Sequence, residues 1–240
     1  VDAIHEAREE IRIGIAAQLT EQLIDTYERC TIAEPYHHGP EQSGKRRLRN
    51  VALSYLTALD DDEAIALAKA QFDDAANMTD SIGALVALND CDTPVRSEAL
   101  SAFYDRWQGD ALVIDKWFTL QATSTRPDTL TRINELMDHE AFSMTTPNRV
   151  RALIGAFCSS NQLKFHNGDG SGYEFLADRV VELNGINPQI AARLLTPLSR
   201  WRRFDSDRQA LMKACLERVL ATPELSRDVF EIASKTLESD

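Results

Sequence analysis

The sequence is poor in cysteine and lacks any close cysteine pair. Its four cysteines, Cys30, Cys91, Cys158 and Cys215, are scattered without a Cys-x-x-Cys spacing. This pattern argues against a zinc knuckle and against a dense disulfide framework. We interpret all four as free, buried, small apolar residues in a reducing compartment, and we therefore expect a cytoplasmic protein.

Positive charge is also scarce. Lys and Arg number 26 against 38 Asp and Glu, which gives a net charge of -12. Such a chain repels polyphosphates and anionic membranes at long range, so we expect no nucleic-acid partner and no membrane partner. No apolar run approaches the roughly 18 residues of a membrane span. The start, VDAIHEAREE, lacks the order of a signal peptide, and a first residue other than Met predicts a fragment of a longer chain.

Catalytic motifs are missing as well. A zinc-peptidase helix needs His-Glu-x-x-His, but Glu9 and Ser143 stand where the second histidine should follow the two His-Glu pairs. There is no Gly-x-Ser-x-Gly elbow, P-loop or Rossmann fingerprint. We predict no catalytic residue and no metal ligand in this chain.

Alternating strand patterns are absent, and helical patterns take their place. Apolar residues follow helical spacing near the N-terminus, at Ile4, Ala7, Ile11, Ile15, Leu19, Leu23 and Tyr27. A capping residue followed by proline predicts four helix starts, at Thr93-Pro94, Thr146-Pro147, Asn187-Pro188 and Thr222-Pro223. Asn77 and Asp80 have the spacing of a capping box. These patterns predict an all-α protein.

A degenerate pattern, Arg-x-x-Ala-Leu, begins at Arg49, Arg96 and Arg149. Its intervals are close to the roughly 40 to 47 residues of helix-pair arrays. The pattern predicts a superhelical array of antiparallel helix pairs, an α-solenoid of the HEAT or armadillo type, whose concave face binds other molecules. Coincidence is the alternative, because Ala-Leu is common on helix faces.

We expect residues 1–240 to form a single helical domain. Leading helices should cover 1–30, a loop 31–44 and the helix-pair array 45–240. The loop segment TIAEPYHHGPEQSG holds two prolines and two glycines. We read its adjacent His37 and His38 as ordinary loop residues, because a tetrahedral metal site needs further ligands.

One glycine-rich stretch, FHNGDGSGYEF, covers residues 165–175. No Lys follows its glycines, so it is not a P-loop. Polar residues occupy the first, third and fifth positions of a calcium loop, but Asp178 is too short for the twelfth. We favour a glycine-permitted turn in which Asp169 or Ser171 caps a helix that begins near Tyr173, with calcium binding as the alternative.

Five separated blocks carry a family resemblance. They are NMTD (77–80), DKWFTLQA (115–122), TTPNRVRALIGAF (145–157), FHNGDGSGYEFL (165–176) and NPQIAARL (187–194). Together they resemble the C-terminal domain of the bacterial-type aminopeptidase N family of zinc gluzincin aminopeptidases. The resemblance implies an all-helical superhelix that follows a catalytic domain, and it implies that zinc is held upstream, in the full-length enzyme and not in this chain.

The resemblance also implies substrate-binding positions. In this family the helical domain closes over the catalytic domain, and arginine and polar side chains face the bound peptide. The matching positions are Arg151 in NRVRAL and Gln189 with Arg193 in NPQIAARL. Gln189 and Arg193 are four apart and share a helix face, and an arginine fork binds a carboxylate or carbonyl at two points. The alternative is that each arginine forms an ordinary salt bridge.

We therefore predict the non-catalytic C-terminal helical domain of a zinc-dependent aminopeptidase N, which closes the active-site chamber and controls peptide access and binding. Its expected partners are its own upstream catalytic domain and peptide substrates, and the chain alone should be inactive. Given the overall acidity, we interpret the basic run Arg200, Arg202 and Arg203 as a solvated face or a contact to the catalytic domain, with a binding patch as the alternative. An independent α-solenoid adaptor for a partner protein or peptide is the alternative function.

Overall fold

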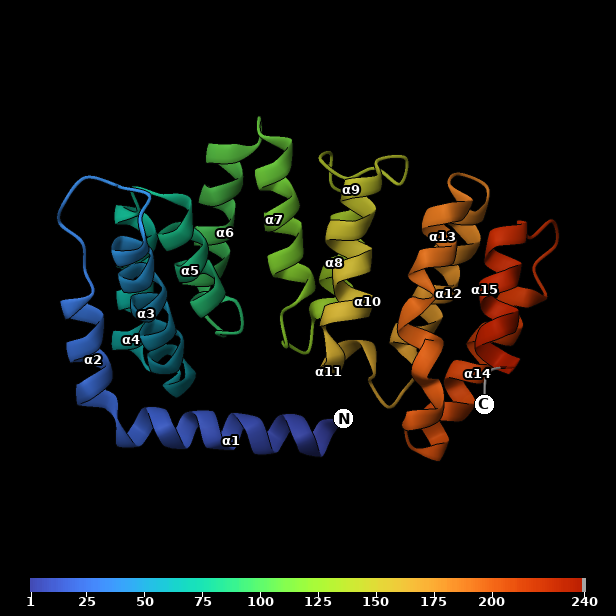
Figure 1. Cartoon of the computed structure of the whole chain (residues 1–240), viewed down its shortest axis with the longest axis horizontal. Helices are drawn as coiled ribbons and strands as arrows, with labels where there is room; N and C mark the ends of the chain where they lie inside the picture. The colour runs from blue at the N-terminus through green and yellow to red at the C-terminus, as the bar shows by residue number, and fades with distance from the viewer. Residues whose placement is uncertain (239–240) are drawn as a thin grey trace. The chain divides into compact units, whose positions relative to one another are not determined.

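The structure, a computed structural model, describes residues 1–238 (Figure 1). These residues form helices and connecting loops, with no β-strand among them, which confirms the predicted all-α class. They divide into two compact units, an N-terminal unit of residues 2–107 and a C-terminal unit that starts at Gln108.

The N-terminal unit is built from paired helices. Its elements are α1 (Asp2–Gln18), α2 (Thr20–Arg29), α3 (Pro40–Leu56), η1 (Thr57–Leu59), α4 (Asp62–Asp74), α5 (Met78–Leu88) and α6 (Pro94–Trp107). α2 packs against α3, α4 packs against α5, and α3 joins the two pairs by packing against α5. The predicted capping box opens α5, where the Asn77 Oδ1 accepts the Asp80 N–H at 3.0 Å and the Asn77 Nδ2 donates to the Asp80 carboxylate at 2.8 Å.

The loop that we predicted over residues 31–44 is shorter in the structure, because α3 already begins at Pro40. Gly39 precedes it in an extended conformation, with φ -160° and ψ 161°. Proline is suited to the first helical position, since the N–H that it lacks would have no partner there.

The C-terminal unit contains shorter elements. They are α7 (Ala111–Ala122), α8 (Thr129–Met137), α9 (Pro147–Val150), the π-helical turn η2 (Arg151–Gly155), α10 (Ala156–Ser160), α11 (Gln162–Phe165), α12 (Ser171–Asn184), α13 (Pro188–Leu194), the 3₁₀ segment η3 (Thr196–Arg203), α14 (Ser206–Leu220) and α15 (Arg227–Glu238). α9, η2 and α10 follow one another without a break, and η2 packs against α7. α12 and α15 each pack against both α13 and α14.

Three of the four helix starts predicted from proline are correct, since α6, α9 and α13 begin at Pro94, Pro147 and Pro188. The start predicted at Thr222-Pro223 is wrong. The Thr222 hydroxyl donates to the Arg218 carbonyl at 3.4 Å, so this residue closes the end of α14 and does not cap a new helix. α15 begins later, at Arg227.

The repeated arginines have a common structural role. Arg49 donates from Nη2 to the hydroxyl of Tyr27 on α2 at 2.8 Å. Arg96 donates from Nε to the backbone carbonyl at the end of α5 at 2.6 Å, and Arg149 donates from Nε to a carbonyl of the loop before α9 at 2.8 Å. Each arginine thus ties its helix to the element before it. The Ala and Leu of each repeat are buried, so the pattern marks core positions on three helices.

The apolar stripe of α1 lies on the surface. Ile4 is 68% exposed and Ile11 is 63% exposed, whereas Ala16 is fully buried. α1 contacts α3 and η1, and the Arg12 Nη2 donates to the Ser54 carbonyl at 2.6 Å. The helix that we predicted here is present, but the described residues do not cover its apolar face.

Candidate functional site

Gln189 and Arg193 lie on α13, and the sequence determines where this helix starts. The Asn187 side chain accepts the Ile190 N–H at 3.2 Å, and Pro188 occupies the first helical position. Because they are four apart, Gln189 and Arg193 both project from the exposed side of α13. Both line one cavity of about 380 Å³.

This cavity, which we call the α13–α15 cavity, combines donors and acceptors. Its other lining residues are Ala192, Thr196, Asp228, Glu231 and Ile232. Within the described chain, the side chains of Gln189 and Arg193 have no hydrogen bond and no ion pair. A peptide backbone carries one donor and one acceptor per residue. The cavity therefore presents donors, on its guanidinium and amide groups, beside acceptors, on its carboxylates.

Arg151 lies outside the lining of this cavity, on the π-helical turn η2. It is exposed, and its Nη1 donates to the Asn148 Oδ1 at 3.1 Å. A Cβ placed on Gly155 would lie 3.8 Å from the Arg151 Cβ and 3.9 Å from the Leu194 Cδ2 at the end of α13. η2 therefore borders α13, and π-helical turns occur frequently at functional sites. The structure brings two predicted residues into one cavity and puts the third on a neighbouring helix.

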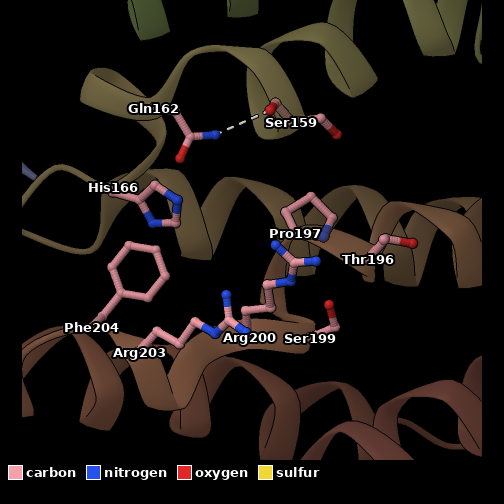
Figure 2. Close-up of a pocket in the computed structure, with 9 residues that line it drawn as sticks. All are labelled: Ser159, Gln162, His166, Thr196, Pro197, Ser199, Arg200, Arg203 and Phe204. Carbon is pink, nitrogen blue, oxygen red and sulfur yellow. Dashed lines mark hydrogen bonds between the residues drawn. The ribbon is translucent and has the colours of Figure 1, made fainter.

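A larger cavity, of about 510 Å³, adjoins the first, because Thr196 lines both. Figure 2 shows its lining residues, Ser159, Gln162, His166, Thr196, Pro197, Ser199, Arg200, Arg203 and Phe204. Arg200 and Arg203 extend from η3, both are exposed, and neither has a side-chain hydrogen bond or ion pair within residues 1–238. We call this space the η3 cavity.

His166 forms an uncharged wall of the η3 cavity. Its Nδ1 lies 2.9 Å from the Tyr173 hydroxyl, and its ring stacks on Phe204 with 4.3 Å between centroids. Burial, together with the positive charge of Arg208, lowers the pKa of His166 to about 4. His166 is therefore neutral at pH 7, and the positive charge at this cavity comes from the two arginines of η3.

These features suit the η3 cavity to an anionic group such as a carboxylate, since guanidinium groups bind carboxylates through two parallel hydrogen bonds. The sequence signal was the basic run around Trp201, which left open whether it formed a patch or a solvated face. The structure gives the arginines of this run different roles, because Arg200 and Arg203 line the cavity and Arg202 does not. Arg202 stacks on Trp201 at 4.3 Å and donates to the Leu237 carbonyl at 2.6 Å, so it has a structural role.

The glycine-rich stretch forms the turn that we predicted, but the predicted cap is wrong, because Gly170 and not Asp169 or Ser171 is the N-cap residue of α12, and it makes no side-chain cap hydrogen bond. The Asp169 Oδ1 accepts the Ser171 N–H at 2.9 Å, and Gly170 has a left-handed φ of 78°. α12 begins at Ser171, slightly earlier than predicted. In residues 1–238 no group of three or more His, Cys, Asp or Glu side chains could hold a metal ion.

The four cysteines are free and buried, as predicted. Burial is the main cause that raises the pKa of Cys91 to about 11 and that of Cys215 to about 12. Both therefore remain protonated at neutral pH, and protonated thiols are poor nucleophiles. No helix in the described part of the chain is long and apolar enough to span a membrane.

Comparison with known proteins identifies the family. A family model described as "Domain of unknown function (DUF3458_C) ARM repeats" matches residues 1–238. The chain is 41% identical over 235 residues to aminopeptidase N of Escherichia coli (strain K12) and 39% identical over 235 residues to aminopeptidase N of Caulobacter vibrioides. Each match covers 98% of this chain but 27% of the relative, so the chain spans about a quarter of the length of these relatives.

A solved structure agrees with these matches. The crystal structure of Legionella pneumophila aminopeptidase A in complex with aspartic acid has a TM-score of 0.91 and 32% sequence identity to this chain. It covers 100% of this chain, which corresponds to 29% of that protein. The repeat description of the family confirms the predicted α-solenoid class. The chain belongs to the DUF3458_C ARM-repeat family and corresponds to the C-terminal domain of bacterial-type aminopeptidase N.

Proposed function

We propose that this chain is the non-catalytic helical domain of a zinc-dependent aminopeptidase, where it closes the active-site chamber and controls which peptides enter and bind. One observation carries the proposal. Gln189 and Arg193 line the α13–α15 cavity without a side-chain partner in the described chain, in a domain that matches aminopeptidase N over 98% of its length. Polar groups that line a cavity without an internal partner are free to bind a ligand.

Each residue has a distinct role in the proposal. The Arg193 guanidinium donates to a peptide carbonyl, and the Gln189 amide both donates to and accepts from the backbone. Arg151, on the π-helical turn η2, contacts the peptide from that turn. Holding the peptide behind its N-terminus orients the scissile bond and so lowers the entropic part of the barrier.

The proposal assigns zinc and hydrolysis to a catalytic domain outside this chain, because the chain matches only 27% of the length of the aminopeptidase N relatives. There zinc would polarise the scissile carbonyl and activate a water molecule. That upstream domain and peptides are the proposed partners. The four free, buried thiols support a reducing, cytoplasmic location.

The test uses the full-length enzyme with Gln189→Ala or Arg193→Ala. We expect KM for a tetrapeptide to rise about five- to tenfold, the loss of about 1 kcal/mol of hydrogen bonding to a charged or amide group. We expect kcat to stay close to the wild-type value, because the lost contact is equal in the ground and transition states. Kinetics on a single-residue alanyl chromogenic amide should not change, since it has no peptide tail.

Arg47→Ala is the matched control, because Arg47 is also exposed and has no side-chain partner in the described chain, but lies in the N-terminal unit. The isolated chain, supplied with zinc, should not hydrolyse the alanyl amide. Turnover by the isolated chain, or an unchanged tetrapeptide KM in both α13 variants, contradicts the proposal.

A further inference from the structure

The η3 cavity carries positive charge that the described chain does not neutralise. Arg200 and Arg203 line it without an ion pair, and none of the described residues in its lining is acidic. Other arginines of the C-terminal unit have carboxylate partners: Arg149 pairs with Asp115, Arg208 with Asp205 and Arg218 with Asp178. Two like charges in one cavity repel each other, and a bound anion offsets this repulsion.

A ligand in this cavity can reach its donor groups, because the residues that carry them are accessible. Arg200 and Arg203 are exposed, and Figure 2 shows both side chains extending from η3 toward the other lining residues. Ser159 and Ser199 are exposed as well, and their hydroxyls have no hydrogen bond within residues 1–238. These guanidinium and hydroxyl groups are therefore available as hydrogen-bond donors to a ligand.

Part of the cavity wall is uncharged and apolar. His166 stacks on Phe204 and is neutral at pH 7, because burial is the main cause that lowers its pKa to about 4. Pro197 adds further apolar surface. The volume of about 510 Å³ lies within the range of roughly 300–1,000 Å³ that is usual for small-molecule sites. The cavity therefore has room for a charged group together with the carbon chain that bears it.

The neighbouring α13–α15 cavity indicates which molecule supplies the anion. Thr196 lines both cavities, and η3 begins at Thr196 directly after α13 has ended at Leu194. In the proposed function the α13–α15 cavity holds the main chain of a peptide. A peptide that continues from there into the η3 cavity brings its own anionic group, since peptides carry a carboxylate at the C-terminus and on Asp and Glu side chains.

We propose that the η3 cavity binds a carboxylate of the peptide substrate through the guanidinium groups of Arg200 and Arg203. This inference rests on the proposed function, because it takes the α13–α15 cavity as the site of the peptide main chain. Guanidinium groups bind carboxylates through parallel hydrogen bonds and stay charged at any working pH. The domain thereby favours peptides that carry a negative charge at or near their C-terminal end.

The experiment measures kcat and KM of the full-length enzyme on alanine peptides with a free C-terminus and on the same peptides as C-terminal amides. Peptides of about three to eight residues are compared, because each extended residue adds roughly 3.3–3.6 Å of reach. At the length that reaches the η3 cavity, we expect the acid to have a KM about three- to tenfold lower than the amide. We expect equal kcat values, because the contact is the same in the ground and transition states.

A third peptide series distinguishes the two sources of a carboxylate. It consists of amides whose last residue is glutamate, which carry a side-chain carboxylate but no C-terminal one. A KM as low as that of the alanine acid shows that a side-chain carboxylate also binds. A KM as high as that of the alanine amide assigns the cavity to the C-terminal carboxylate.

Arg200→Gln and Arg203→Gln test the residue assignment. Each removes one charge from an exposed side chain that has no partner in the described chain, so folding should be kept. In each variant we expect the KM of the acid to rise toward that of the amide, while the KM of the amide stays unchanged. Arg47→Gln removes the same charge from an exposed residue of the N-terminal unit and should keep the preference for the acid.

Two results would overturn this inference. One is an equal KM for acid and amide at every peptide length in the wild-type enzyme. The other is a preference for the acid that persists unchanged in both η3 variants. Gln189 and Arg193 are proposed to contact main-chain groups, so their variants should raise KM for acids and amides alike. If they do so while acid and amide bind equally, this inference fails and the proposed function stands.

Discussion

At the scale of single residues, Gly172 cannot easily be replaced, because the Phe165 backbone lies too close to it and not because of its own backbone conformation. It lies in the first turn of α12, where its own conformation suits any residue. A Cβ at this position would lie 2.2 Å from the Phe165 carbonyl oxygen, and the next two nearest atoms, at 2.8 and 2.9 Å, also belong to the Phe165 backbone. The end of α11, at Phe165, therefore packs directly against the first turn of α12.

Gly172→Ala should therefore lower the free energy of unfolding by about 2–3 kcal/mol, because a backbone segment must move to make room. Urea denaturation followed by circular dichroism measures the change. Gly185→Ala is the control: its Cβ would meet nothing within 4 Å, and its φ of -81° and ψ of -16° suit alanine. The control should be neutral or stabilise by up to about 1 kcal/mol. Equal stabilities of the two variants would show that the Phe165 contact imposes no constraint.

At the scale of elements, α1 shows that a predicted helix can be present although its apolar face is not buried. Its apolar spacing is sufficient to predict a helix, and the helix is present. Its apolar side chains are nevertheless largely exposed, and the core of the N-terminal unit is formed by residues such as Leu53 and Leu88 on other helices.

We predict that Ile4→Gln combined with Ile11→Gln changes the free energy of unfolding by less than about 0.5 kcal/mol, because both side chains are already in water. Leu53→Ala, at a fully buried position, should cost about 2–5 kcal/mol. Thermal and urea denaturation of the three proteins provide the comparison. A loss above about 1 kcal/mol in the α1 variant would mean that the helix face is covered in solution.

Capping signals also show the limits of prediction at this scale. Asn187-Pro188 and Thr222-Pro223 are equivalent patterns in the sequence, yet α13 begins at the first and no helix begins at the second. The difference is the hydrogen bond of the capping side chain, because the Asn187 Oδ1 accepts the Ile190 N–H of the new helix. α14 ends at Leu220, and the Thr222 hydroxyl bonds back to it before a new helix can start.

At the scale of the whole molecule, the excess of acidic residues controls long-range interactions. With a net charge of -12, the exposed arginines of the η3 cavity are a local exception in a repulsive field. They suit one carboxylate and not the extended phosphate backbone of a nucleic acid, which requires many cations along its length.

We therefore predict no shift of duplex DNA in an electrophoretic mobility assay at about 50 mM salt, a condition that favours nonspecific binding. A basic DNA-binding protein at the same concentration should shift the duplex and validates the assay. A shift that weakens as salt increases would contradict the charge argument.

The sequence alone determined the all-α class, most helix starts, the repeated core positions and the burial of the cysteines. These are properties of local spacing, of capping side chains and of apolar character, and neighbouring residues in the chain are sufficient to specify them. Family resemblance pointed to Gln189 and Arg193, and their spacing of four was enough to place both on one helix face.

Only the tertiary structure decided which polar groups meet in a cavity and which already have a partner. Arg49, Arg149 and Arg200 are the same residue type, and the sequence does not tell their roles apart. In the structure the first two link a helix to the element before it. The third lines the η3 cavity without a side-chain partner in the described chain. One cavity of the N-terminal unit is lined by side chains of α3, α4 and α5 that are far apart in the sequence. Packing between helices sets such contacts, and spacing along one helix carries no information about the side chains that another helix brings to it.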